Sequence, residues 1–246
     1  MKAELTIKEL HADDLCQGLL RHFNRYQEVK RALRRENGIA SPIKPCQQIG
    51  EGFLVQSKEV PTTHSCKSEI CTQSTGRSKL GGTDEAMCQN HRQDTVRFNR
   101  WSNKWALKDV VFTEQWDEKM KQEIVDVDFK NCLKSGGFVW GVFNRENQLI
   151  AFACLLSDFF GSSGQYLQLT QIHVSSEYRN MGVGKELFRV AVEKARELGA
   201  EKLYISAHSS EESQYFYESI GCEDAAEVNE RLAKLEPYDR QMEYVL

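Results

Sequence analysis

The chain begins with two segments that carry regular patterns and then loses its pattern for a long stretch. Residues 5–10 alternate apolar and polar side chains, which predicts an opening strand, and residues 12–35 are expected to form a helix that Asn37-Gly38 ends. From 39 to 104 the periodicity disappears, and three of the chain's four prolines lie there. This range is expected to be a polar, disordered insertion, because it has no repeating apolar face to bury in a core.

Regular spacing returns with the segment WALKDVVF at 105–112. Apolar residues at helical spacing then predict a core-facing helix over 113–134, which Gly136-Gly137 ends. Two short apolar runs follow at 138–144 and 149–156, and the polar residues between them favour an antiparallel hairpin.

The next strand, YLQLTQIHV at 166–174, changes the phase of its alternation. Its apolar positions are Leu167 and Leu169, and then Ile172 and Val174. One inserted residue would produce this shift, so the pattern predicts a β-bulge, with ordinary irregular patterning as the alternative. A bulge would leave backbone N–H and C=O groups unpaired, and bulges are over-represented beside active sites.

The glycine-bearing turn RNMGVG at 179–184 lies between this strand and an amphipathic helix that Gly199 closes. Such a turn favours phosphate, because the first N–H groups of a helix have no intrahelical partner and lie at the positive end of its dipole. A Walker A loop is excluded, since Arg179 and Glu186 stand where glycine and Ser/Thr are needed. A dinucleotide fingerprint is weak, since Leu187 replaces the third glycine, and a turn without a ligand stays open.

The segments beyond this helix complete a βαβ unit with the glycine turn at the carboxyl end of its first strand. KLYIS at 202–206 is a short buried strand. Ser209 and Glu212 are expected to form a capping box that opens a helix ending at Gly221, and RQMEYVL at 240–246 is the last strand.

Length and composition limit the class of protein. A chain of 246 residues with 40% hydrophobic residues and a formal net charge of −4 is expected to be globular. No apolar run approaches a membrane span and no signal-peptide core is seen, so a cytoplasmic protein that does not contact membranes is expected. The basic stretch at 21–35 is interpreted as a solvated helix face, with a nucleic-acid-binding stripe as the alternative.

The cysteines are interpreted as free thiols of a reducing compartment. One group of thiols and imidazoles lies close together in the sequence but contains no paired C-x2-C knuckle: His64, Cys66, Cys71, Cys88 and His91. We therefore expect unpaired thiols in a loop and no metal, with a zinc site at this group as the alternative.

Three features together resemble the GNAT N-acetyltransferase family over most of the chain outside the insertion. They are the loop RNMGVG, the preceding strand that ends Ile172-His173-Val174, and the downstream segment SSEESQYFYESIGC. The resemblance implies a mixed α/β fold with a twisted, mostly antiparallel central sheet flanked by helices. It also implies a single domain over 1–246, interrupted by the insertion at 39–104.

The family frame assigns roles to specific positions. The loop would bind the pyrophosphate of acetyl-CoA, the bulged strand would hydrogen-bond its pantetheine arm, and Tyr217 would protonate the departing thiolate. Ser210 and Ser213 stand where the family places an asparagine and an alanine beside the pantetheine. The implied cofactor-binding residues are Ile172, His173, Val174, Arg179, Asn180, Met181, Gly182, Val183, Gly184, Lys185, Ser210 and Ser213.

The sequence departs from the family at the general base. Gln168 occupies the strand position that some relatives fill with glutamate, and an amide cannot accept the proton. His173 and Glu177 are the nearest titratable side chains, although each is also typical of a structural role. Deprotonation through ordered water is the preferred hypothesis.

We therefore expect an N-acetyltransferase that moves an acetyl group from acetyl-CoA directly to a primary amine of a small molecule in a ternary complex. The alternatives are a CoA-binding regulatory module without transfer activity, and a nucleic-acid-binding protein that uses the basic N-terminal helix. The acceptor is not determined by any motif: an antibiotic, a polyamine-like metabolite and a protein amine all stay open, as does a homodimer.

Overall fold

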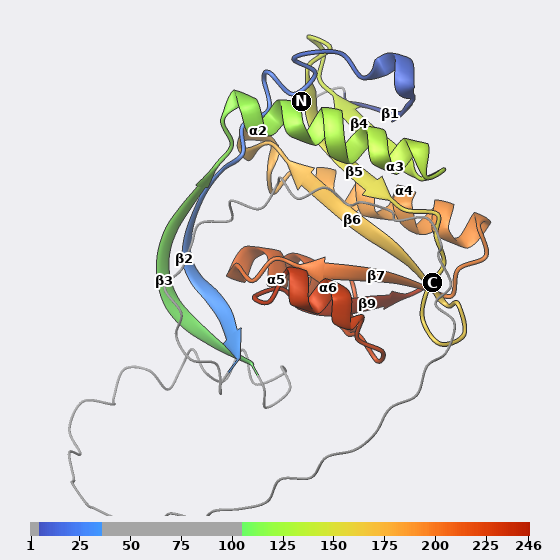
Figure 1. Ribbon diagram of the computed structural model, residues 1–246. Coiled ribbons are helices and arrows are strands. Elements are labelled where there is room, and N and C mark those ends of the chain that lie inside the picture. The colour runs from blue at the N-terminus through green and yellow to red at the C-terminus, as the bar shows by residue number, and fades with distance from the viewer. Residues whose placement is uncertain (1–4, 36–104) are drawn as a thin grey trace, which may run out of the picture. The chain divides into compact units, whose positions relative to one another are not determined.

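The computed structural model describes residues 5–35 and 105–246, which belong to one compact unit (Figure 1). The predicted insertion at 39–104 and its thiol and imidazole group lie outside the described residues. The interrupted single domain therefore stays a prediction.

A seven-stranded sheet forms the centre of the described unit, with strand order β1-β4-β5-β6-β7-β9-β8. Every neighbouring pair is antiparallel except β6 and β7, which are parallel. This mixed, mostly antiparallel sheet confirms the predicted fold class. In chain order the strands are β1 Thr6–Leu10, β4 Phe138–Phe143, β5 Leu149–Leu155, β6 Tyr166–Val174, β7 Lys202–Ala207, β8 Glu223–Asp224 and β9 Arg240–Val245.

The sheet divides between β6 and β7. These two strands pair over only three residues each, from Tyr166 opposite Lys202 to Gln168 opposite Tyr204. Beyond Gln168, β6 stays paired with β5 while β7 stays paired with β9, so the two halves diverge, as Figure 1 shows. Among the described strands, none pairs with the freed edge of β6.

Helices cover both faces of the sheet. Helix α4, Val183–Glu197, packs its apolar side against Ala151, Ala153 and Leu155 of β5 and against the inner residues of β6 and β7. On the opposite face, Phe152 and Cys154 of the same strand pack against one continuous helical segment. That segment consists of α2 Glu118–Glu123, the π-helical turn η2 Ile124–Phe129, and α3 Lys130–Lys134. Because successive side chains of β5 point to opposite faces of the sheet, they contribute to two separate hydrophobic cores, one on each face.

The predicted helix over 12–35 is wrong. Only the turn η1, Ala12–Asp14, is helical, and Tyr26–Arg35 forms strand β2, which pairs with β3, Trp105–Gln115, as a separate two-stranded ribbon. A shift of register between Val29 and Arg31 interrupts the alternation of buried residues in β2, which hid the strand pattern. Gly18, with a φ of +78°, also breaks any helix in this range.

Two other predicted helix starts require correction. The helix expected from 113 begins at Glu118, where the Asp117 side chain accepts a hydrogen bond from the N–H of Met120. Helix α5, Glu211–Ser219, is capped by Ser210 and not by Ser209. In both cases the strand or turn before the helix extends further than the apolar spacing indicated. The short helix α6, Glu230–Leu235, was not predicted.

Candidate active site

The predicted bulge lies in β6, directly beside the division of the sheet. Leu169 faces Leu155 and Gln171 faces Cys154, so Thr170 is the additional residue. The Thr170 hydroxyl donates to the carbonyl of Cys154 at 3.3 Å, which holds the bulge on the β5 side. The phase change in the sequence therefore corresponds to a real insertion in the ladder.

The loop after β6 presents unused hydrogen-bond donors. The backbone N–H groups of residues 180–185 donate to no acceptor in the described part of the chain. Asn180 and Gly182 have φ values of +60° and +84°, so the loop turns through the left-handed region just before α4 begins. Free donors at the first turn of a fifteen-residue helix are suited to bind an anion.

Gly184 serves a different purpose from Gly182. A Cβ added to Gly184 would lie 3.2 Å from the ring of Phe216 in α5, whereas one added to Gly182 would meet nothing within 4 Å. Gly184 therefore allows close packing between α4 and α5, and Gly182 supplies the backbone conformation of the turn.

Arg179 supplies the cation of this loop. Its Nε donates to the carbonyl of Val174 at 3.2 Å, and its Nη2 is a buried atom without a hydrogen-bond partner. Burial, together with the charge of Arg25, lowers the pKa of Arg179. A buried guanidinium nitrogen without an acceptor is costly, and it fits an anionic group such as pyrophosphate at the start of α4.

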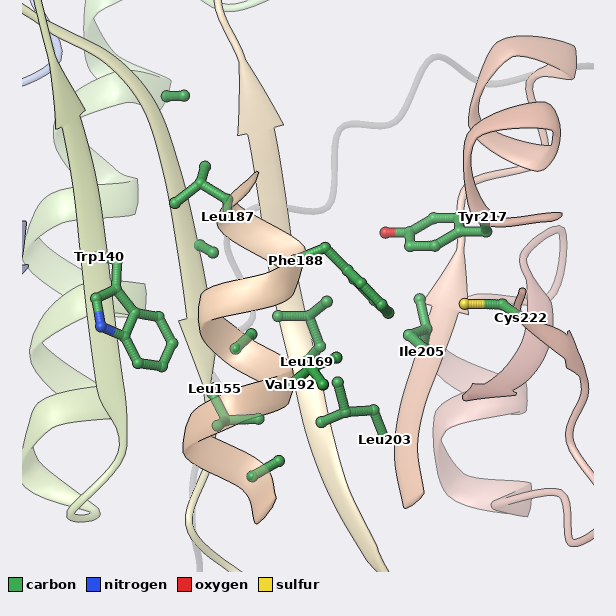
Figure 2. Packing of buried hydrophobic residues seen from close by; sticks show 14 of the residues in the cluster. Trp140, Leu155, Leu169, Leu187, Phe188, Val192, Leu203, Ile205, Tyr217 and Cys222 are labelled. Atoms are coloured by element: carbon green, nitrogen blue, oxygen red, sulfur yellow. The ribbon is translucent and has the colours of Figure 1, made fainter. Parts of the chain in front are cut away.

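Tyr217 projects from α5 into the core that α4 covers. Its side chain is buried beside Phe216 and Cys222, and Figure 2 shows the hydroxyl pointing away from its own helix toward α4. No hydrogen bond joins this hydroxyl to another described residue, so its donor capacity is unused. Burial raises the pKa of Tyr217, which keeps the phenol protonated at neutral pH.

The two predicted serines are engaged in the cap of α5. The Ser210 hydroxyl donates to Ser213 Oγ at 2.9 Å and accepts the N–H of Ser213 at 3.4 Å, and Ser210 is fully buried. Their contact with a cofactor stays a prediction, as do the contacts of Ile172, His173 and Val174.

The sequence pattern did not predict an ionic network that includes His208, the residue directly after β7. Glu114 of β3 accepts from Arg25 at 2.5 Å and from His208 Nε2 at 2.9 Å. Burial would raise the pKa of Glu114, but the hydrogen bond from His208 and the charge of Arg25 outweigh it and lower the pKa to about 2. The three residues come from β3, the segment before β2, and the end of β7, so no local spacing could have brought them together.

The two candidate bases named from the sequence are in different surroundings. Glu177 accepts from Asn24 at 2.6 Å and from the Ser175 hydroxyl at 2.7 Å, which is a turn-stabilising role. His173 packs against Trp116 and Phe152, and burial, with the charge of Arg25, lowers its pKa to about 3. His173 is therefore neutral and weakly basic at physiological pH.

Two other kinds of feature are not found in the described ranges. The side chains of residues 5–35 and 105–246 include no group of three or more potential metal ligands. No helix there combines the length and apolar character that a membrane crossing requires.

Comparison with known proteins agrees with the geometry of the loop and the divided sheet. The sequence model described as "Acetyltransferase (GNAT) family" matches residues 101–222. The chain carries a GNAT acetyltransferase domain. The match covers the bulged strand, the loop with Arg179, and α5 with Tyr217, and it places the chain among acetyl-CoA-dependent acetyltransferases.

Two solved structures resemble the fold, and each alignment covers almost the whole chain. One is a nourseothricin acetyltransferase, with 12% identity, a TM-score of 0.52, and 98% coverage of both chains. The other, from Bacillus anthracis str. Ames, is assigned as a streptothricin acetyltransferase and was solved with acetyl coenzyme A. It has 14% identity and a TM-score of 0.51, and it covers 100% of this chain and 98% of its own. No curated protein matches the chain.

Proposed function

We propose that this GNAT protein transfers the acetyl group of acetyl-CoA directly to a primary amine of a small molecule. The observation that carries the proposal is the buried, unsatisfied Nη2 of Arg179 at the start of a loop whose six backbone N–H groups, at residues 180–185, have no acceptor in the described part of the chain. This combination fits the pyrophosphate of the cosubstrate. The freed edge of β6 next to the loop would accept the pantetheine arm as an added strand.

The remaining residues have complementary roles. Acetyl-CoA supplies a thioester whose carbonyl carbon is open to attack by an amine. The backbone at the bulge offers a hydrogen bond to the carbonyl oxygen, and Tyr217, kept protonated by burial, offers a proton to the sulfur. Loss of the amine proton to ordered water is retained in this proposal, because Gln168 cannot accept a proton and His173 is a weak base.

A small-molecule acceptor is favoured by the two structural neighbours, which are named for antibiotic acetylation. Because the sequence identity to both neighbours is low, the likeness supports the fold of this chain. The names of the neighbours are a reason to include such antibiotics in a screen of acceptors. A regulatory CoA-binding module remains the alternative outcome of that screen.

The nucleic-acid alternative loses its basis, because the basic N-terminal helix does not exist. Arg25 pairs with Glu114, Arg31 lies 3.4 Å from Glu211, and Arg34 donates to Ser209 and to a backbone carbonyl. These cations are used within the fold.

The test is release of CoA thiol from acetyl-CoA in the presence of a panel of amines, with direct calorimetry of acetyl-CoA binding. The panel contains nourseothricin, spermidine, a lysine-containing peptide and p-anisidine, which is uncharged at neutral pH. We expect acetyl-CoA binding and turnover of a small amine. Binding without turnover of any amine would favour the regulatory module, and turnover of the peptide alone would overturn the small-molecule acceptor.

A further inference from the structure

The π-helical turn η2 places an acidic side chain beside β6. Within η2, Ile124, Val125 and Phe129 are buried in the core on the face of the sheet opposite α4. Asp128 precedes Phe129 and is half-buried. Single turns of π-helix often occur at functional sites, since the wider turn changes the direction of one side chain relative to its neighbours.

Asp128 is fixed next to the bulge by a single contact. Gln171 Nε2 donates to Asp128 Oδ2 at 2.7 Å, and Gln171 directly follows the inserted residue Thr170. Gln171 faces Cys154, whose side chain belongs to the core on the side of η2. The carboxylate therefore lies on the face of β6 opposite α4, one side chain away from the bulge.

The charge of Asp128 has no counter-ion in the described part of the chain. Its hydrogen-bond partner is the neutral amide of Gln171, and no ion pair among residues 5–35 and 105–246 involves it. Burial raises the pKa of Asp128, and the nearby Glu123 raises it further. By contrast, Glu114 has both Arg25 and His208, and the more exposed Asp126 pairs with Lys130. A partly desolvated carboxylate without a cation favours a cationic ligand.

Other polar groups near the division cannot bind a cation as directly. Both oxygens of Glu114 are occupied, and both nitrogens of His208 are used, one toward Glu114 and the other as acceptor for the N–H of Ser210. His173 carries no negative charge in either of its states. Burial raises the pKa of Asp239 to about 7, and His208 and Arg34 already supply positive charge near this carboxyl group.

We propose that Asp128 binds the ammonium group of the acceptor and positions it beside the β6 bulge. The proposal rests on the acetyltransferase function proposed above and narrows the acceptor to amines that are protonated at neutral pH. The carboxylate contributes a charge-assisted hydrogen bond to the ammonium, and Gln171 holds the carboxylate in place. The bound ammonium then loses one proton to ordered water, which frees the nitrogen lone pair for attack on the thioester. Asp128 is thus a specificity-determining residue on the acceptor side, separate from the acetyl-CoA loop.

The test compares Asp128→Asn with Asp126→Asn, a matched neutralisation two residues away on the same helical segment. For the best cationic amine of the panel, Asp128→Asn should lower kcat/KM by about tenfold to a hundredfold, the scale of a lost charge-assisted hydrogen bond, chiefly through KM. Turnover of p-anisidine, if present, should change little, because that amine carries no charge. Acetyl-CoA affinity should be unchanged, and Asp126→Asn should resemble the wild type.

The outcomes separate this proposal from the proposed function. If the wild type turns over a cationic amine and Asp128→Asn does so equally well, the role of Asp128 is overturned while the acetyltransferase function stands. If the wild type binds acetyl-CoA but acetylates no amine, the function itself fails and the role of Asp128 falls with it. Should Asp128→Asn fold poorly, Asp128→Ser provides the same readout, because it also removes the charge and should lose the preference for cationic amines.

Discussion

Arg179 shows most directly how one residue indicates a ligand. Its buried Nη2 has no acceptor, so the free protein bears a desolvation cost that an anion would relieve. Replacing it with Gln removes the charge at little cost to the fold.

We expect Arg179→Gln to weaken acetyl-CoA binding by about tenfold to a hundredfold and to leave the melting temperature unchanged or raised. Calorimetric titration and thermal melts measure both. Lys194→Gln, in the last turn of α4, is the matched control for loss of a positive charge away from the loop. A large fall in the melting temperature of Arg179→Gln with unaltered affinity would assign Arg179 a structural role.

At Tyr217 the ring and the hydroxyl make separate contributions. The ring fills the core with Phe216 and Cys222, whereas the hydroxyl has no partner in the described residues. Tyr217→Phe should therefore fold normally and bind acetyl-CoA normally, but lose roughly a hundredfold or more in kcat. Steady-state kinetics with a confirmed acceptor checks this expectation. Near-normal kcat in the folded variant would exclude Tyr217 as the proton donor.

At the scale of elements, the turn between β6 and α4 depends on the conformation of Gly182. A φ of +84° is unfavourable for an L-residue with a Cβ, although no atom would obstruct that Cβ. We expect Gly182→Ala to destabilise the fold by about 1 kcal/mol, and Gly182→Asn to cost less because asparagine visits the left-handed region more readily. Urea denaturation compares the two. Equal stability of Ala and Asn variants would argue against backbone strain as the cause.

The ribbon of β2 and β3 provides a second test at this scale. Arg35 and Trp105 are register partners, so the chain leaves and re-enters the described unit at adjacent positions. Replacing residues 36–104 with Asn-Gly would close the two strands with a tight hairpin turn. We expect this variant to fold and to bind acetyl-CoA with normal affinity, as thermal melts and calorimetry would show. Loss of either property would mean that the excised range contributes to the domain.

At the scale of the whole molecule, His173 links stability to pH. Its folded pKa of about 3 lies below the ordinary value of 6.5, so the unfolded chain binds the proton more readily. The stability associated with neutral His173 is complete above pH 6.5 and is lost as the pH falls toward 3. His208 has a raised pKa, so its contribution is already complete below pH 6.5, and the lowered pKa of Glu114 matters only below 4.5.

We therefore expect the melting temperature of His173→Gln to fall less, or rise more, than that of the wild type as the pH is lowered from 6.5 to 4.5. The amide does not titrate in this range, so the difference in slope isolates the imidazole. Parallel curves for the two proteins would show that His173 accepts a proton in the folded state without cost.

The sequence by itself determined the features that arise from short-range patterns. The hairpin of β4 and β5, the bulge in β6, the glycine turn and the amphipathic α4 each follow from the spacing of apolar residues and glycines within about twenty positions. These features were sufficient to identify the family and to predict which loop binds its cosubstrate. The ribbon strand β2 was missed, because its irregular register removed the period of two on which such a prediction depends.

Only the tertiary structure decided which polar side chains share the site. Glu114 meets Arg25 across 89 positions of the sequence and His208 across 94, and Asp128 meets Gln171 across 43. Charge pairing and burial at such separations depend on how strands and helices stack, and no local pattern encodes that. The sequence could not show that Arg179 lacks an acceptor or that Asp128 lacks a cation. A group counts as unpaired only when all of its spatial neighbours are known, and the tertiary structure supplies those neighbours.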